Sequence, residues 1–151
     1  MKDSSGALER LFHNRRTITK IVNLTPHELV VYALSDCNAV TKGPYTSLTL
    51  KDGAEPMLRI PSSGVARAVS TEEKVGSIEF NGASIPEVSV KFGAPVGLPE
   101  QLEADTLYIV SAITVQSCRE HGVAVDQLRL VADTVRDAEG KIVGCTALAR
   151  A

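Results

Sequence analysis

Short runs of aliphatic and β-branched residues, separated by turn residues, dominate the pattern of hydrophobic and polar positions along the chain. Residues 21–24 and 29–32 form two such runs, and Pro26 lies between them. Because proline has no N–H group to donate to a ladder, we expect two strands here with a turn or bulge between them. The same pattern predicts further strands at residues 57–60, 65–70 and 107–110.

Turn residues predict two hairpins. Asn81-Gly82 lies between strand-like residues 74–80 and 84–92, and both turn residues tolerate positive φ, which is a strong hairpin signal. Residues 137–140 form the turn of a closing hairpin near the C-terminus. The stretch 35–57 is polar and rich in Gly, Lys, Asp and Pro, so we expect an insertion loop with one minor strand.

One helix is expected after the run at residues 107–110. Residues 112–121 place Val115 and Cys118 three positions apart, and Gly122 is a suitable C-terminal stop. Residues 128–132 fit either a strand or the end of a second helical segment. Together these elements predict an α+β domain, an antiparallel β-meander with one or two short helices.

The 151 residues suffice for one ordinary domain. Residues 1–19, where Lys and Arg outnumber Asp and Glu, are predicted to form a flexible basic arm, and residues 20–151 a single ligand-binding domain. The arm lacks the apolar core of a secretory signal, and no apolar stretch approaches the roughly 18 residues that a membrane span needs. We therefore expect a cytoplasmic protein with no membrane partner.

Charge and residue spacing exclude several kinds of chemistry. The net charge of −2 disfavours long nucleic acids as partners. The cysteines are odd in number and far apart, which predicts free thiols, and the histidines have no second ligand at a metal-like spacing. We find no nucleophile elbow and no phosphate loop. A conventional enzyme is therefore not favoured, and neither a metal nor a cofactor is expected.

A set of polar and cationic side chains remains on the β-rich part of the chain. Arg can bind a phosphate with two hydrogen bonds, Asp accepts from ribose hydroxyls, Tyr stacks on a base, and Thr and Gln contact a base edge. Such a set fits a small anionic ligand that carries sugars and a base. The candidates are Arg67, Lys91, Tyr108, Thr114, Gln116, Arg136 and Asp137.

Structural roles remain open for the same residues. Asp137 can accept hydrogen bonds from the backbone of its own turn, at the exposed end of a strand with Arg136. Thr114 and Gln116 can lie on an ordinary helix surface or in dimer packing.

Several short motifs occur in an order that resembles a family of small phage and prophage proteins, the anti-Thoeris sponges. The resemblance covers residues 20–148 and leaves out the arm and residues 35–57. The motifs are Asn23-Leu-Thr-Pro-His27, Ile60-Pro-Ser-Ser-Gly64 with Ala66-Arg67, Gly97-Leu-Pro99, Tyr108-Ile-Val-Ser111, Val135-Arg-Asp and Gly140-Lys-Ile-Val-Gly-Cys145.

The resemblance implies a noncatalytic binder. Such a protein holds intact the glycocyclic ADP-ribose signal that TIR-domain enzymes make, and so inhibits a bacterial anti-phage defence. The resemblance also implies dimers that assemble into hexamers and, for some members, separate sites for cyclic oligonucleotides.

The resemblance also assigns ligand contacts by motif. Arg136 and Asp137 match a ligand-binding Arg-Asp pair, while Thr114 and Gln116 match a Thr and an amide residue two positions apart. Asn is expected where this chain has Gln116. The remaining matches are Tyr108 as the stacking partner, Lys91 as a second cation, and Ser62, Ser63, Gly64 and Arg67 as the loop for a cyclic oligonucleotide.

Two other functions stay open. The first is a phage structural or assembly accessory protein, whose oligomeric β-surface is its whole function. The second is a phosphodiesterase that degrades the signal, which the lack of metal-ligand spacing disfavours.

Overall fold

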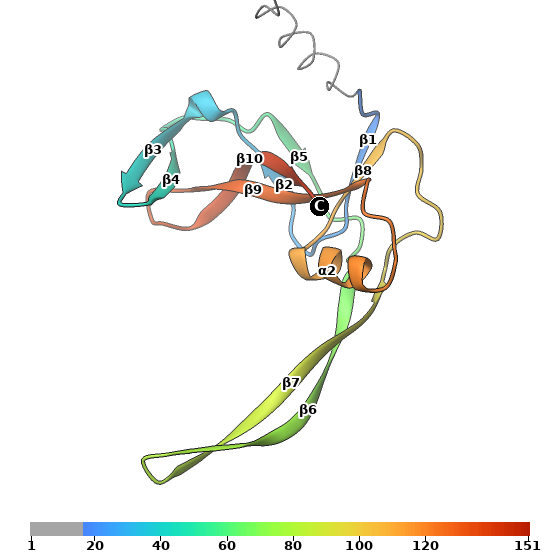
Figure 1. Ribbon diagram of the computed structural model, residues 1–151. Coiled ribbons are helices and arrows are strands. Elements are labelled where there is room, and N and C mark those ends of the chain that lie inside the picture. The colour runs from blue at the N-terminus through green and yellow to red at the C-terminus, as the bar shows by residue number, and fades with distance from the viewer. Residues whose placement is uncertain (1–16) are drawn as a thin grey trace, which may run out of the picture.

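The computed structural model describes residues 17–151, so most of the predicted arm lies outside the described residues. Figure 1 shows a β-rich body with one α-helix beneath its sheet and a long hairpin that projects from it. The elements are β1 (Lys20–Asn23), β2 (Leu29–Val31), the 3-10 helix η1 (Leu34–Asp36), β3 (Cys37–Lys42), β4 (Tyr45–Leu50), β5 (Leu58–Ile60), β6 (Arg67–Phe80), β7 (Ala83–Val96), β8 (Thr106–Ile109), α2 (Ala112–Glu120), β9 (Leu128–Arg136) and β10 (Ile142–Arg150).

The main sheet is mixed rather than a meander, which corrects the predicted topology. Its order is β1-β8-β9-β10-β2-β5, with parallel pairs β1/β8, β8/β9 and β10/β2. A bridge between Asn23 and Ser62 brings the two ends of this order together, so the six strands nearly close into a ring. The chain leaves the sheet after β5 and returns at β8, so pairs form between strands far apart in sequence, which local patterns do not reveal.

The predicted insertion loop is a second correction, because residues 37–50 form a hairpin. Strands β3 and β4 pair along their whole length, and β4 also pairs in parallel with β9. Most side chains of β3 are exposed, so its pattern has no buried face to reveal it. The turn is at Gly43, whose φ of 59° suits glycine.

Helix α2 matches its predicted position. The Ser111 hydroxyl caps its first turn by accepting a hydrogen bond from the Thr114 N–H, at 3.3 Å. The helix ends at Glu120, and Gly122 has the positive φ of 71° expected just after a helix. Residues 128–132 belong to a strand, which resolves the second alternative. An α+β domain with few helices is therefore confirmed.

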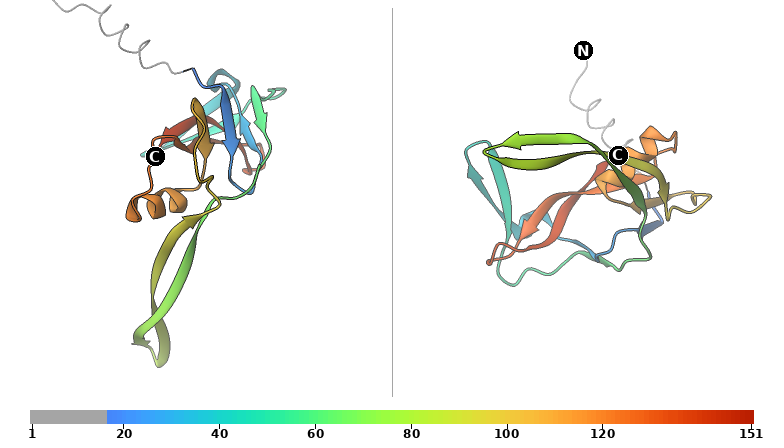
Figure 2. Two further views of the ribbon diagram at one scale, coloured as in Figure 1. Left: turned by 90° about the vertical axis from the view of Figure 1, so that its right-hand side faces the viewer. Right: turned by 90° about the horizontal axis from the view of Figure 1, so that it is seen from below.

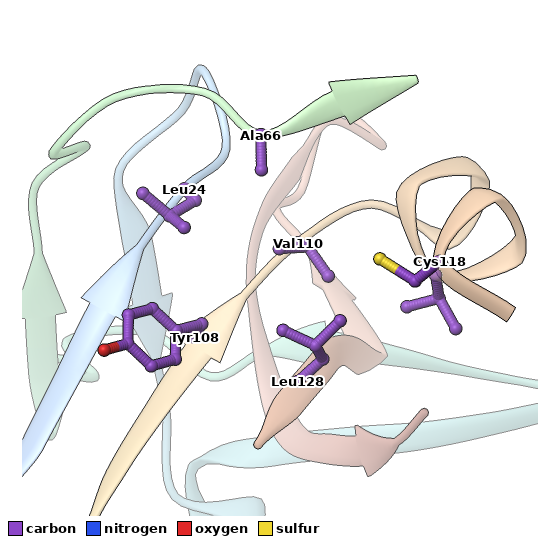
Figure 3. Close-up of a cluster of buried hydrophobic side chains, with 7 residues drawn as sticks. Leu24, Ala66, Tyr108, Val110, Cys118 and Leu128 are labelled. Carbon is purple, nitrogen blue, oxygen red and sulfur yellow. The ribbon is translucent and has the colours of Figure 1, made fainter. Parts of the chain in front are cut away.

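The largest core cluster lies between the main sheet and α2. Figure 3 shows Leu24, Tyr108, Val110 and Leu128 converging from the sheet, with Cys118 reaching them from the helix. Tyr108 and Val110 are two positions apart at the end of β8, and Leu128 and Leu130 are two positions apart on β9, so one face of each strand meets the helix. The sheet carries two further clusters, around Ile109 and around Val135.

A buried asparagine holds the loop that connects β1 to β2. The Asn23 amide donates to the carbonyls of His27 at 2.7 Å and Ile60 at 3.1 Å, and its carbonyl oxygen accepts from Thr25. Since the side chain is fully buried, each of these bonds replaces one to water. Asn23 thus joins the loop at residues 24–28 to β5.

Strands β6 and β7 form a separate two-stranded sheet, which we call the ribbon (residues 67–96). The predicted Asn81-Gly82 turn is confirmed, with φ of 48° and 79° at the two residues. Figures 1 and 2 show the ribbon extending well beyond the body. Its apolar side chains are largely exposed, and Phe80 at the tip is 66% exposed.

The three cysteines are free, as predicted, and the structure buries all of them. Burial raises the pKa of each thiol, Cys37, Cys118 and Cys145, because the charged thiolate loses its hydration. Within residues 17–151, no helix is long and apolar enough to cross a membrane.

Candidate binding site

A cleft of about 440 Å³ lies between α2 and the base of β7. It brings together two of the candidate residues, Lys91 and Gln116, which are far apart in sequence. The Ser117 hydroxyl fixes the helix against the strand by donating to the Gly93 carbonyl. We call this cleft the helix–ribbon cleft. Its lining residues are Val90, Lys91, Phe92, Gln116, Glu120 and His121.

The cleft combines apolar, amide and cationic groups. Phe92 is half-buried, and Lys91 is exposed. The Gln116 amide donates to the Glu120 carboxylate at 3.2 Å, which holds the amide along the helix. The His121 Nδ1 atom lies 2.9 Å from the Ser117 carbonyl oxygen. Because that oxygen only accepts, Nδ1 carries a proton, and Nε2 is left for another partner.

Thr114 and Tyr108 do not contribute to this cleft. The Thr114 hydroxyl donates to the Ala66 carbonyl at 3.0 Å and is fully buried. The Tyr108 ring is 2% exposed, and its hydroxyl accepts from the Glu103 N–H at 2.9 Å. In this conformation the ring has no free face, so the expected stacking role of Tyr108 does not agree with its place in the core (Figure 3).

Arg136 ends β9 and Asp137 begins the turn to β10, and Figures 1 and 2 place this turn far from α2. The Asp137 carboxylate accepts from the N–H groups of Glu139 and Lys141, both at 2.9 Å. The exposed Arg136 guanidinium donates to the Gly140 carbonyl at 2.7 Å. Both side chains therefore hold the backbone of their own turn, which is the structural alternative given above. Within one chain they do not lie near Lys91 and Gln116.

The loop predicted to hold a cyclic oligonucleotide closes the ring of strands. The Ser62 hydroxyl donates to the Thr25 carbonyl at 2.6 Å, and the Ser63 N–H donates to the Asn23 carbonyl at 2.8 Å. Gly64 has a φ of 146°, and Arg67 is exposed at the start of β6. The Ser62 side chain and the Ser63 backbone thus have bonding partners inside the fold.

A larger cleft, of about 690 Å³, has no counterpart among the predictions. Its lining is mostly apolar and comes from β2, β9 and β10, together with His27, Lys141 and the start of α2. Glu28, which also lines it, pairs with Arg59 at 2.8 Å. Three of the short motifs, residues 23–27, 108–111 and 140–145, supply much of this lining. They are separate in sequence, so only the fold shows that they meet at one cleft.

Comparisons with family models, with curated proteins and with solved structures found no match. In the part of the chain that the structure describes, no three His, Cys, Asp or Glu side chains are arranged to hold a metal ion.

Proposed function

We propose that this protein is a noncatalytic binder that sequesters a small cyclic nucleotide, a glycocyclic ADP-ribose signal of TIR-domain enzymes, in the bacterial cytoplasm. The observation that carries the proposal is the helix–ribbon cleft, whose lining includes a cation, an amide and an aromatic ring. Its volume of about 440 Å³ falls within the range of small-molecule sites, roughly 300–1,000 Å³.

Each group in the cleft has a chemical counterpart in such a ligand. The Lys91 ammonium pairs with a phosphate, and the Phe92 ring packs against the base. The Gln116 amide can both donate to and accept from a base edge, which permits recognition of a particular base. Binding of this kind needs complementary contacts but no aligned nucleophile, so the ligand is held and released unchanged.

Calorimetry with a cyclic ADP-ribose isomer tests the proposal. We expect Lys91→Ala to weaken binding about 10- to 100-fold, because the ligand phosphate loses a charged partner. Lys42→Ala removes an exposed lysine from β3, in the body, and serves as the matched control with unchanged affinity. Equal affinity of the Lys91→Ala variant and the parent would contradict the site.

A second arm of the experiment examines the ligand after binding. Heating the complex and analysing the released compound should return it intact. An altered product would instead indicate the phosphodiesterase alternative. Arg136→Ala distinguishes the two candidate locations: if it weakens binding while Lys91→Ala does not, the ligand contacts the β9–β10 turn.

The projecting ribbon favours one other candidate function, a structural or assembly accessory protein. Its exposed apolar side chains are typical of a surface that contacts another protein. A protein that assembles but depletes no cyclic nucleotide from solution would support this alternative.

A further inference from the structure

The ribbon has one face whose composition is fitted for contact with another protein. In the antiparallel register, Val90 lies opposite Glu72, and Val88 lies opposite Lys74. Directly opposed residues share a face, and so do alternate residues along a strand. The resulting surface, which we call the valine face, consists of Glu72, Lys74, Val88, Val90 and Phe92.

The valine face has little in its own chain to cover it. Val88 and Val90 are 46% and 48% exposed. An isolated two-stranded sheet is at best marginally stable in water, because it has no second layer on which to bury apolar side chains. A ribbon with 14 residues in each strand therefore gains stability when another surface packs on it.

The charges on this face identify the surface that fits it. The pair Glu73–Ser89 marks the central level of this segment. The pair Glu72–Val90 lies one residue to one side of that level, and the pair Lys74–Val88 lies one residue to the other side. Consider two ribbons packed face to face, with a two-fold axis between them that crosses the strands at this central level. The axis places the Glu72–Val90 level of one ribbon against the Lys74–Val88 level of the other. Glu72 then faces the partner's Lys74, and Val90 faces the partner's Val88.

We propose that the valine face is a dimerisation surface whose occupant is the same face of a second copy of this chain, in antiparallel orientation. Every charge on the face gains an opposite charge from the partner, and the valines and Phe92 meet apolar groups. A partner of a single charge sign would leave either Glu72 or Lys74 without a counterpart. Isologous two-fold contacts of this kind are the commonest in homo-oligomers.

The opposite face of the ribbon fits a second copy less well. Glu73 and Lys91 lie on it, and Glu87 lies opposite Gly76, so its central part is polar. Its apolar residues gather toward the tip, where Ile78 pairs with Ile85. This face provides the control in the test.

The dimer bears on the proposed function because Val90 and Phe92 belong both to the valine face and to the helix–ribbon cleft. In the antiparallel arrangement Phe92 faces Pro86 of the partner subunit, near the tip of the partner's ribbon. The partner thus adds a wall to the open cleft. Only this consequence rests on the proposed function; the dimer itself requires no ligand.

Sedimentation equilibrium without ligand, at micromolar concentration, tests the interface. The parent should be a dimer, or a larger assembly built from dimers, and Val90→Asp should weaken the dimer about a hundredfold by placing an unpaired charge in the contact. Ile85→Asp is the matched control, since Ile85 is 49% exposed on the opposite face and its dimer should persist. Circular dichroism establishes that both variants keep the fold of the body.

Three outcomes would overturn the proposal: a monomeric parent, equal dissociation of both variants, or dissociation by Ile85→Asp alone. Ligand binding is measured separately, so failure of the proposed function leaves this result intact.

Charge exchange provides a second test of the two-fold register. Glu72→Lys and Lys74→Glu should each weaken the dimer, because each places like charges opposite one another twice. An equimolar mixture of the two variants should associate more tightly than either alone, since every pair in the mixed dimer is again opposite in charge. A mixture no tighter than its components would contradict the antiparallel register.

Discussion

The body and the ribbon are both β-structures, but different interactions hold them. In the body, the strands nearly close into a ring, which leaves few unpaired edges, and a helix covers one face of the sheet. Within residues 17–151 no buried side-chain polar atom lacks a hydrogen-bond partner. The ribbon contacts α2 only at its base, where the Ser117 hydroxyl bonds the Gly93 carbonyl; beyond it the two strands have cross-strand pairs, and side chains on both faces are exposed. The body thus has a core of its own, whereas in the dimer that we propose a second copy gives the ribbon the layer that it lacks.

Truncation of equivalent aliphatic side chains should separate the two regions most strongly. Leu128 is fully buried between the sheet and α2, so Leu128→Ala should lower the free energy of unfolding by about 2–5 kcal/mol. Ile85→Ala in the ribbon should cost less than about 1 kcal/mol, since half of that side chain is already in water. Urea unfolding followed by circular dichroism measures both. Equal costs would show that the ribbon has a core comparable to that of the body.

Loss of a buried polar group tests the bonded network of the body. Asn23→Ala removes the amide that joins the loop at residues 24–28 to β5, and with it one hydrogen bond each to the carbonyls of His27 and Ile60. We expect a cost of about 2–3 kcal/mol in unfolding free energy. Thr71→Ala, on the ribbon, removes a long 3.5 Å bond and is the control with little effect. A cost below that of Thr71→Ala would show that the Asn23 network does not hold the loop.

Two glycines provide the finest comparison, because the same substitution should have opposite signs. A Cβ atom on Gly144 would lie 2.7 Å from the Val30 carbonyl oxygen and 2.8 Å from the Tyr32 ring, so Gly144→Ala should destabilise by about 1–3 kcal/mol. Gly76 in the ribbon has no atom within 4 Å of that position. Gly76→Ala should leave stability unchanged or raise it by about 0.4–1 kcal/mol. Thermal melts of both variants check the signs, and destabilisation by Gly76→Ala would reveal a close neighbour on the ribbon.

Local signals in the sequence account for part of this fold. The Asn81-Gly82 turn, the capped helix before Gly122 and the turn at Asp137 each depend on neighbouring residues, and each is found where predicted. The topology of the main sheet depends on pairs such as Lys20 with Thr106, which no local pattern encodes. Within residues 35–57 the sequence predicts one minor strand, whereas the structure has a hairpin of two, because the exposed side chains of β3 leave no alternation of hydrophobic and polar positions.

The candidate site was less predictable than the fold. Residue chemistry selects Lys91 and Gln116, but their meeting depends on how α2 packs against β7. The same chemistry selects Tyr108 and Thr114, whose polar atoms the fold uses for its own hydrogen bonds. Residue type does not show whether a tyrosine or threonine lies in the core or in a binding site, so burial decides between the two.

Hydrogen exchange at two protein concentrations tests most directly the claim that the ribbon depends on a second copy. We expect the backbone amides of β6 and β7 to exchange more slowly well above the dimer dissociation constant than well below it, because association suppresses local opening of the ribbon. Amides of β8 and β9 in the body should exchange at rates that do not depend on concentration. Ribbon protection that is the same at both concentrations would contradict the account.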